Sequence, residues 1–364
     1  MFYEWIYPLH KLHGLSAFNV FRYITFRAAY AAITALILCY IAGPPLIGWL
    51  KQVGLGQKVR QEGPQTHLSK AGTPTMGGIL NVAAIVVPCL LWGNFHSRPL
   101  WIALAATVWL GAIGFLDDYL RVVKGLRKGL LGRYKLAGQI TLGLAIAITL
   151  MVWPEPGGLP PTSTQVPFLK FRWLDFGWLF VPFVVLVVTG SSNAVNLTDG
   201  LDGLASGLMA IAALAFAGMC YLTGHARFSE YLNLIYLPYS GELTVFCAAV
   251  FGASLGFLWY NCHPADVFMG DTGSLALGGA LGTVAVLIKR ELWLVLVGGV
   301  FVAEALSVMI QVTSFRLWGR RVFRMSPLHH HFELAGWAES RVVLRFYICG
   351  ALLALLGLST FKLQ

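Results

Sequence analysis

Residues 100–118 read LWIALAATVWLGAIGFLDD, and this stretch decides the fold class. No charged side chain occurs in it before Asp117 and Asp118. The hydrocarbon core of a bilayer is about 30 Å thick, and roughly 20 apolar residues of helix cross it. The segment is therefore predicted to be a membrane-spanning helix that ends in two adjacent carboxyl groups.

The composition of the whole chain indicates the same class. Of its 364 residues, 57% are hydrophobic and 12% are charged, whereas soluble domains carry about 25% charged residues. The length leaves no room for a separate soluble domain, so residues 1–364 are predicted to form a single integral membrane domain. The formal net charge of +10 is attributed to membrane topology and to contact with anionic lipid, and no nucleic-acid partner is expected.

Further apolar windows predict an all-α polytopic membrane protein of about ten transmembrane helices. Paired glycines inside several windows allow close approach of helix backbones, which favours a compact bundle. Alternating residues near 166–175 predict a small external β-hairpin. The windows are residues 23–46, 75–92, 100–116, 136–153, 178–193, 204–222, 242–260, 274–288, 292–315 and 342–358.

Lysine and arginine are distributed unequally between the two sides that the alternating loops define. The side with the loops at 49–74, 117–135, 195–203, 261–273 and 316–341 carries about 15 of them, and the side with both termini carries about 9. Cytoplasmic loops of membrane proteins are enriched in these residues. The first group of loops is therefore predicted to be cytoplasmic, and both termini are predicted to be external.

Six aspartates fall at the predicted cytoplasmic ends of the spans. An acid at membrane depth is costly unless it meets a cation, a metal or a water-filled cavity. Converging carboxylates repel one another, so a divalent cation would stabilise the group. Each acid could instead cap a helix end, although the loops around Asp199 and Asp271 contain no lysine or arginine to pair with them. The six are Asp117, Asp118, Asp199, Asp202, Asp266 and Asp271.

Three further segments carry groups suited to phosphate. Residues 268–274 (FMGDTGS) place glycines and an acid before a helix, whose N-terminus favours phosphate oxygens. Residues 70–78 (KAGTPTMGG) open another helix with a basic side chain and hydroxyls. Residues 327–333 (PLHHHFE) hold three histidines. Adjacent side chains diverge and no cysteine completes a zinc site, so these histidines are predicted to hydrogen-bond or protonate phosphate.

Together these segments resemble a known enzyme family. Residues 74–78 (PTMGG), 114–119 (GFLDDY), 193–203 (NAVNLTDGLDG) and 270–274 (GDTGS) are similar to motifs of the polyprenyl-phosphate N-acetylhexosamine-1-phosphate transferase superfamily. The triple-histidine segment at 327–333 resembles the phospho-N-acetylmuramoyl-pentapeptide-transferase branch. The resemblance covers essentially the whole chain.

This resemblance implies a reaction. Phospho-N-acetylmuramoyl-pentapeptide would pass from UDP-N-acetylmuramoyl-pentapeptide to undecaprenyl phosphate, which gives lipid I and UMP in peptidoglycan synthesis. A Mg²⁺ cofactor, a multi-pass location in the bacterial inner membrane, an active site facing the cytoplasm and a homodimer are also implied. Direct attack by the acceptor phosphate, with Asp117 acting on that phosphate, is the favoured mechanism, and a covalent aspartyl intermediate is the alternative.

The resemblance also assigns roles to individual residues. It implies Asp271 as a magnesium ligand and Phe268 as a stacking partner for uracil. Arg121 departs from the family, which often has lysine at this position, and the two side chains are not equivalent. The implied catalytic residues are Asp117, Asp118, Asp199, Asp271 and His330. The implied substrate-binding residues are Lys70, Thr75, Arg121, Lys135, Asn196, Asp202, Phe268, Gly270, Ser274, Gln311, His329 and His331.

Two other functions compete with this one. A sister enzyme that uses UDP-N-acetylglucosamine would keep the aspartates but lack the histidine segment at 327–333. An ion-coupled transporter would place acids near the middle of its spans. Here only Glu304 lies well inside a predicted span, and the aspartates gather at one rim. The transferase is therefore the predicted function.

Overall fold

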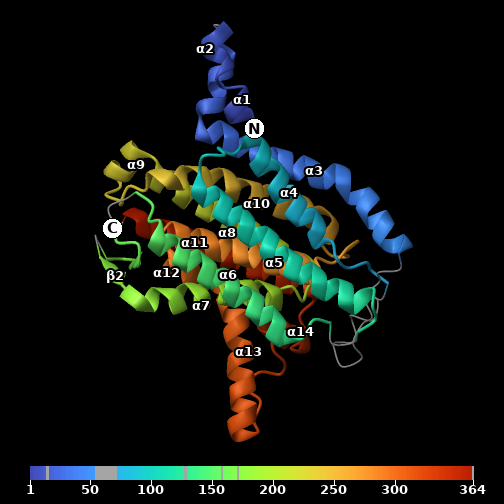
Figure 1. Cartoon of the computed structure of the whole chain (residues 1–364). Helices are drawn as coiled ribbons and strands as arrows, with labels where there is room; N and C mark the ends of the chain where they lie inside the picture. Colours follow the sequence, from blue (N-terminus) through green and yellow to red (C-terminus); the bar gives the residue numbers. More distant parts are fainter. Residues whose placement is uncertain (14–15, 54–71, 127–128, 157–158, 170–171, 363–364) are drawn as a thin grey trace.

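The computed structural model describes residues 1–13, 16–53, 72–126, 129–156, 159–169 and 172–362, and most of these residues are helical (Figure 1). The long helices are α3 (Ile24–Gln52), α4 (Gly78–Trp92), α5 (Arg98–Val122), α6 (Gly132–Val152), α7 (Phe180–Thr198), α8 (Leu204–Gly224), α10 (Gly241–Asn261), α11 (Gly270–Leu287), α13 (Gly299–Trp318) and α15 (Glu339–Ser359). The short α-helices are α1 (Phe2–Trp5), α2 (Leu9–His13), α9 (Ala226–Tyr231), α12 (Glu291–Val297) and α14 (Leu328–Leu334). Short 3-10 helices cover Ser16–Arg22, Gly177–Leu179, Pro238–Ser240 and Thr360–Lys362.

Length and hydropathy of these helices confirm the all-α polytopic membrane class. Within the described residues, 8 helical segments are long and apolar enough to cross a membrane. Helix α4 is shorter, with 15 residues, and α11 has 18 residues that are almost all buried. The number of ten spans stays a prediction.

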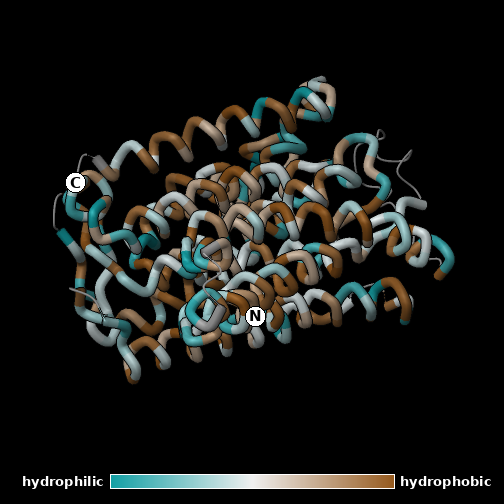
Figure 2. The backbone as a smooth tube through the Cα atoms, turned by 90° about the horizontal axis from the view of Figure 1, so that it is seen from above, coloured by the Kyte–Doolittle hydropathy of each residue, from teal (hydrophilic) through white to brown (hydrophobic). Residues whose placement is uncertain are grey.

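The centre of the bundle is formed by α8, α10 and α11 (Figure 1). The outer helices carry many hydrophobic residues (Figure 2), and large apolar side chains on them are exposed. Helix α11 packs against α5 and α7, and α8 packs against α10. A Cβ atom on Gly78 would lie 2.1 Å from the backbone nitrogen of Gly273, so α4 and α11 can approach this closely only through glycine. The core is thus helix against helix, and the exposed apolar faces are those that lipid would cover.

The predicted span at 292–315 is present but begins later than predicted, because only Gly299–Trp318 is long and apolar enough to cross a membrane. The chain forms two helices there, α12 and α13, which meet at Gly298, and α13 leaves the bundle (Figure 1). Hydropathy gives no sign of this break, because apolar residues continue on both sides of it. Two glycines in succession, Gly298 and Gly299, weaken the helix locally, since glycine costs about 1 kcal/mol relative to alanine in a helix interior.

The predicted hairpin is confirmed, with a shift of its first strand. Strands β1 (Ser163–Gln165) and β2 (Trp173–Asp175) pair antiparallel, with Thr164 opposite Leu174. The second strand lies inside the predicted range of 166–175, whereas the first begins before it. Strand β1 is buried because it docks on the turn before α12, where the backbone N–H of Gln165 donates to the carbonyl of Lys289 (3.2 Å).

The two chain ends lie on the side of the bundle opposite to the aspartates. The amino group of Met1 donates to the carbonyl of Leu90 near the end of α4, whereas α4 begins beside Gly273. Near the other terminus, Thr360 accepts a hydrogen bond from the indole of Trp293 (2.7 Å), which follows the far end of α11. The prediction that both termini are external requires them to lie on the same side of the bundle, as they do here.

Candidate active site

Antiparallel packing brings four of the predicted acids to one end of the bundle. Asp117 and Asp118 lie near the end of α5, Asp199 follows α7, and Asp271 is in the first turn of α11. Carboxylate oxygens of Asp117, Asp118 and Asp271 lie within 4.8 Å of one another. These three acids therefore form one cluster, which we call the aspartate cluster, and Asp199 lies beside it.

Asp118 holds the start of α11. Its Oδ2 accepts hydrogen bonds from the backbone nitrogen (2.9 Å) and the hydroxyl (2.7 Å) of Thr272, and its Oδ1 accepts one from the backbone nitrogen of Asp271 (3.2 Å). The first N–H groups of a helix lack partners within that helix. Asp118 supplies partners from a neighbouring helix and so fixes the position of Asp271.

Basic side chains meet the other two acids of the cluster. Asp117 lies 2.5 Å from Nη2 of Arg121 and 2.8 Å from Nζ of Lys135, and its Oδ1 accepts from the backbone nitrogen of Leu130 (2.6 Å). The same Lys135 ammonium also donates to Asp271, and Nη2 of Arg121 is 3.9 Å from Asp271. The loop around Asp271 contains no lysine or arginine, but a basic partner reaches this carboxylate from elsewhere. Lys135 comes from α6, outside that loop.

An amide and a hydroxyl complete the surroundings of Asp271. The side-chain nitrogen of Asn196 donates to Oδ1 of Asp271 (3.1 Å) and to Oγ of Ser274 (2.8 Å). Ser274 in turn donates to the carbonyl of Gly270 (2.9 Å). The structure thus brings Asn196, Ser274 and Asp271 together, as the predicted site requires.

Gly270 is the residue that lets α5 approach α11. Its φ of +73° lies in the left-handed region, and a Cβ atom there would be 2.7 Å from Oδ2 of Asp118 and 3.1 Å from Oγ1 of Thr75. Thr75, another predicted site residue, is buried and lies against the same backbone. Any side chain at 270 would push the carboxylate of Asp118 away from the helix start.

Asp199 and Asp202 occupy different surroundings although they are three residues apart. Burial, followed by the negative charges of Asp271 and Asp118, raises the pKa of the Asp199 carboxyl to about 7. Asp202 instead has Oδ2 at 3.0 Å from Nδ1 of His263, and its backbone N–H donates to Oε1 of Glu339 (2.9 Å). Asp202 therefore belongs to a second polar group beside the aspartate cluster.

The three histidines make three different contacts. Nδ1 of fully buried His329 lies 3.2 Å from Oε2 of Glu304 on α13. Nδ1 of His330 lies 2.7 Å from Oε2 of Glu333, and Nδ1 of His331 accepts from the backbone nitrogen of Arg324 (3.1 Å). Each ring is thus held separately, and no zinc-like convergence of the three occurs in the described part of the chain.

The remaining predicted site residues are placed as follows. The amide of Gln311 donates to the carbonyl of Phe323 (2.9 Å) and accepts from backbone N–H groups of the same loop, so its hydrogen bonds are used in holding that loop. Phe268 is half-buried, and its carbonyl accepts from the backbone nitrogen of Gly77 (2.9 Å). Asp266 is exposed and stands outside the aspartate cluster. Lys70 lies outside the described residues.

Sequence reasoning missed some polar partners of the site. Thr272 is the main partner of Asp118, and its position next to Asp271 was the available signal. His263 and Glu339 are the partners of Asp202, and no sequence signal connects the three. Glu304 stood out as an acid inside an apolar run, which is a recognised sign of function, but its partner could not be read from the sequence.

The donor set of the cluster fits a divalent cation. Asp117, Asp118 and Asp271 supply carboxylate oxygens, the ligands that Mg²⁺ and Ca²⁺ prefer. Asp117 and Asp271 already face a cation in the form of the Lys135 ammonium, whereas the oxygens of Asp118 accept hydrogen bonds from α11. Asp117 and Asp271 are therefore the residues best placed to hold a metal.

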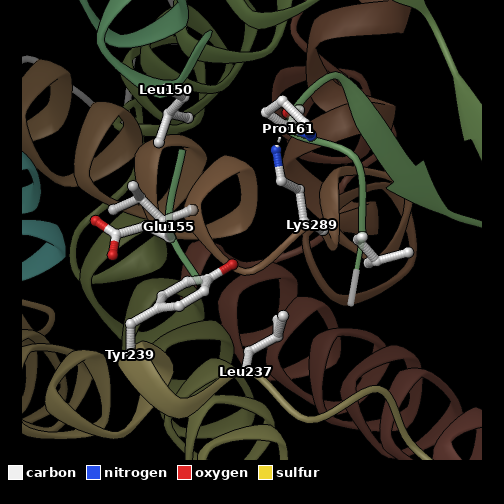
Figure 3. Close-up of a pocket in the computed structure, with 8 residues that line it drawn as sticks. Leu150, Glu155, Pro161, Leu237, Tyr239 and Lys289 are labelled. Carbon is white, nitrogen blue, oxygen red and sulfur yellow. Dashed lines mark hydrogen bonds between the residues drawn. The ribbon is translucent and has the colours of Figure 1, made fainter. Parts of the chain in front are cut away.

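A small cavity at the other end of the bundle is a different feature (Figure 3). Leu150, Glu155, Tyr239 and Lys289 are among the residues that line it, and the Lys289 ammonium donates to the carbonyl of Pro161. Its volume of about 20 Å³ accommodates a single water molecule. The length of α11, about 27 Å for its 18 residues, separates this cavity from the aspartate cluster.

Comparison with known proteins gives a consistent match over this site. The model of glycosyl transferase family 4 matches residues 100–289, and the first signature of phospho-N-acetylmuramoyl-pentapeptide-transferases matches residues 70–80. The chain is 52% identical over 365 residues to the phospho-N-acetylmuramoyl-pentapeptide-transferase of Thermodesulfovibrio yellowstonii, with 100% of both chains covered. The enzymes of the same name from Koribacter versatilis (50% identity, 97% of each chain) and Geobacter sp. strain M21 (51%, 100% of each) are similarly close.

Proposed function

Because the chain belongs to the phospho-N-acetylmuramoyl-pentapeptide-transferases, we propose that its aspartate cluster transfers phospho-N-acetylmuramoyl-pentapeptide from UDP-N-acetylmuramoyl-pentapeptide to undecaprenyl phosphate. The products are lipid I and UMP, and the step belongs to peptidoglycan synthesis. The observation that carries this proposal is the meeting of Asp117, Asp118 and Asp271 with the ammonium of Lys135 at one end of a membrane bundle. Such a site combines basic side chains, which can bind phosphate groups, with carboxylates, which can hold a metal ion.

The charge of the site supports a magnesium cofactor. Arg121 and Lys135 contact Asp117 and Asp271, and the carboxyl groups of Asp118 and Asp199 lie beside these acids without a basic partner among the described residues. Asp117 and Asp271 would hold the ion. When bound, Mg²⁺ would neutralise the diphosphate and stabilise the leaving UMP.

The reaction needs two anions to approach each other, and the basic residues reduce their repulsion. An oxygen of the acceptor phosphate forms a bond to the sugar-linked phosphorus, the bond from that phosphorus to the oxygen of UMP breaks, and UMP leaves with the electron pair. A phosphate monoester has its second pKa near 6, so the acceptor needs no base at neutral pH. Asp117 then acts by holding Lys135 and Arg121 where the phosphates meet.

The surroundings of Asp117 favour direct attack over a covalent intermediate. Its carboxylate is engaged by Arg121, Lys135 and the backbone nitrogen of Leu130. Attack by this carboxylate on phosphorus would break its contacts with the two basic side chains that the phosphates need. Asp117 is therefore assigned to orienting the acceptor phosphate.

The location follows from the substrates. A nucleotide sugar is a soluble cytoplasmic compound, and the acceptor is a membrane lipid, so the aspartate cluster is placed at the cytoplasmic face of the bacterial inner membrane. The excess of lysine and arginine in the loops at this end supports that side. A homodimer is proposed as the assembly.

A direct assay tests the proposal. Purified protein is incubated with Mg²⁺, undecaprenyl phosphate and radiolabelled UDP-N-acetylmuramoyl-pentapeptide, and lipid product and UMP are measured. We expect both products in equal amounts, and none with UDP-N-acetylglucosamine as the donor. Product from UDP-N-acetylglucosamine alone would assign the chain to the sister activity, and no product from either donor would remove the proposal.

A further inference from the structure

Glu304 is a fully buried acid in α13, seven residues before the Gln311 that holds the following loop. A buried carboxylate is costly unless it is paired and hydrogen-bonded. Its partner is His329, which lies in α14 at the other end of that loop and is also fully buried. The pair therefore joins the helix that leaves the bundle to the histidine segment.

Two contacts connect the pair. Oε1 of Glu304 accepts a hydrogen bond from the backbone nitrogen of His329 (3.1 Å), and Oε2 lies 3.2 Å from Nδ1 of the imidazole. The backbone N–H belongs to the first turn of α14, where no partner is available within the helix. One carboxylate therefore holds the backbone of His329 by a hydrogen bond and lies beside Nδ1 of its ring.

The opposite edge of the imidazole faces the turn that follows Asp199. A Cβ atom on Gly200 would lie 2.3 Å from Nε2 of His329, and Gly200 directly follows Asp199. The φ of Gly200 is not in the left-handed region, so space against the imidazole, and not backbone conformation, requires glycine here. Both ring nitrogens are buried and neither makes a hydrogen bond within the described residues, but Nδ1 has the Glu304 carboxylate 3.2 Å away, whereas Nε2 has the turn at Gly200 beside it.

We propose that Glu304 is a positioning residue that orients His329, so that Nε2 of the imidazole faces the ligand phosphates beside the turn at Asp199 and Gly200. A carboxylate at Nδ1 favours a proton on that nitrogen, which leaves Nε2 to interact with the ligand. The inference rests on the proposed transferase function, because it names the group through which Glu304 acts. It adds a residue from inside the apolar run of α13 to the machinery of the site.

A double-mutant cycle tests this coupling. Glu304→Gln keeps an oxygen for the backbone N–H of His329 but removes the charge opposite Nδ1. Loss of the partner that orients a functional histidine reduces activity on the order of 10- to 100-fold, so we expect a fall of that size in kcat for Glu304→Gln and for His329→Gln. The double variant should be no slower than the slower single variant.

Independent effects would contradict the proposal. If the two single reductions multiply in the double variant, or if Glu304→Gln keeps the wild-type kcat, Glu304 does not act through His329. Ser307→Ala is the matched control, because among the described residues its hydroxyl donates to the Glu304 backbone carbonyl one turn away (2.7 Å) and not to the carboxylate, and it should keep the wild-type rate. Wild-type protein that makes no lipid product would instead remove the transferase function itself.

A second pair of variants approaches the imidazole from the other side, in case Glu304→Gln does not fold. Gly200→Ala should lower kcat in the wild-type background, because the new methyl group displaces the ring of His329. In a His329→Ala background the ring is absent, so Gly200→Ala should cause no further loss. A further loss of tenfold or more there would contradict the proposed position of His329.

Discussion

The carboxylate of Asp118 on α5 accepts hydrogen bonds from the backbone nitrogen (2.9 Å) and the hydroxyl (2.7 Å) of Thr272 on α11. This contact joins two helices that are far apart in the chain and holds the residue before Thr272, Asp271, at the centre of the site. An acid that the sequence marks for catalysis thus also sets the geometry of its neighbour.

The hydroxyl of Thr272 should therefore matter for activity. Thr272→Val keeps the shape and the backbone N–H but removes one hydrogen bond to a charged group, a change that costs roughly 1.5–3 kcal/mol. We expect a lower thermal unfolding midpoint in detergent and about a tenfold lower kcat, since 1.4 kcal/mol corresponds to a factor of ten. Thr272→Ser, which restores the hydroxyl, should recover most of the rate. A wild-type rate in Thr272→Val would contradict the role of this contact.

Lys135 should compete with a metal for Asp117 and Asp271. Lys135→Met leaves the two carboxylates without the shared ammonium, so their attraction for a divalent cation rises. We predict that the magnesium concentration for half-maximal activity falls, while kcat falls as well because the phosphates lose a positive group. Both constants come from one titration of transferase activity with Mg²⁺. A higher magnesium requirement in Lys135→Met would show that the lysine supports metal binding instead.

Helices α5 and α11 approach too closely at Gly114 to leave room for a methyl group. A Cβ atom there would lie 2.2 Å from the carbonyl oxygen of Asp271. Gly114→Ala should therefore separate the two helices. We expect no monodisperse peak of this variant in size-exclusion chromatography in detergent, and no transferase activity. Gly132→Ala, at the exposed start of α6 with no neighbour within 4 Å, is the control and should behave like wild type. Normal Gly114→Ala protein would contradict the packing of α5 on α11.

Topology can be tested by cysteine labelling in intact cells. In a background with the exposed Cys262 and Cys349 replaced by serine, cysteines are introduced at Leu126, Val322 or His96. The first two positions are exposed near the end that carries the aspartates, and His96 is exposed in the turn between α4 and α5. A membrane-impermeant maleimide should label only the cysteine at 96. Labelling at 126 or 322 would place the aspartate cluster on the external face.

The sequence allowed the acidic residues of the site to be predicted better than the contacts that these residues make. The acids were found because they follow long apolar windows, and the bundle does bring Asp117, Asp118 and Asp271 together. The pairing of Asp271 with Lys135 could not be predicted, because Lys135 lies on α6, far from Asp271 in the sequence, and only the packing of the helices brings the two together. The break at Gly298 was missed for a related reason: hydropathy measures burial in lipid and is insensitive to the direction in which a helix leaves the bundle.

The central claim is that Asp271 serves the transfer reaction as a metal-holding carboxylate. Asp271→Asn keeps the size of the side chain and removes its charge, and Asp266→Asn is the matched control at an exposed acid outside the cluster. The measurement is the rate of lipid I and UMP formation at saturating Mg²⁺ by well-folded protein. We predict that Asp271→Asn loses several powers of ten in rate and that Asp266→Asn keeps the wild-type rate. An Asp271→Asn protein that retains most of the wild-type rate would contradict the account.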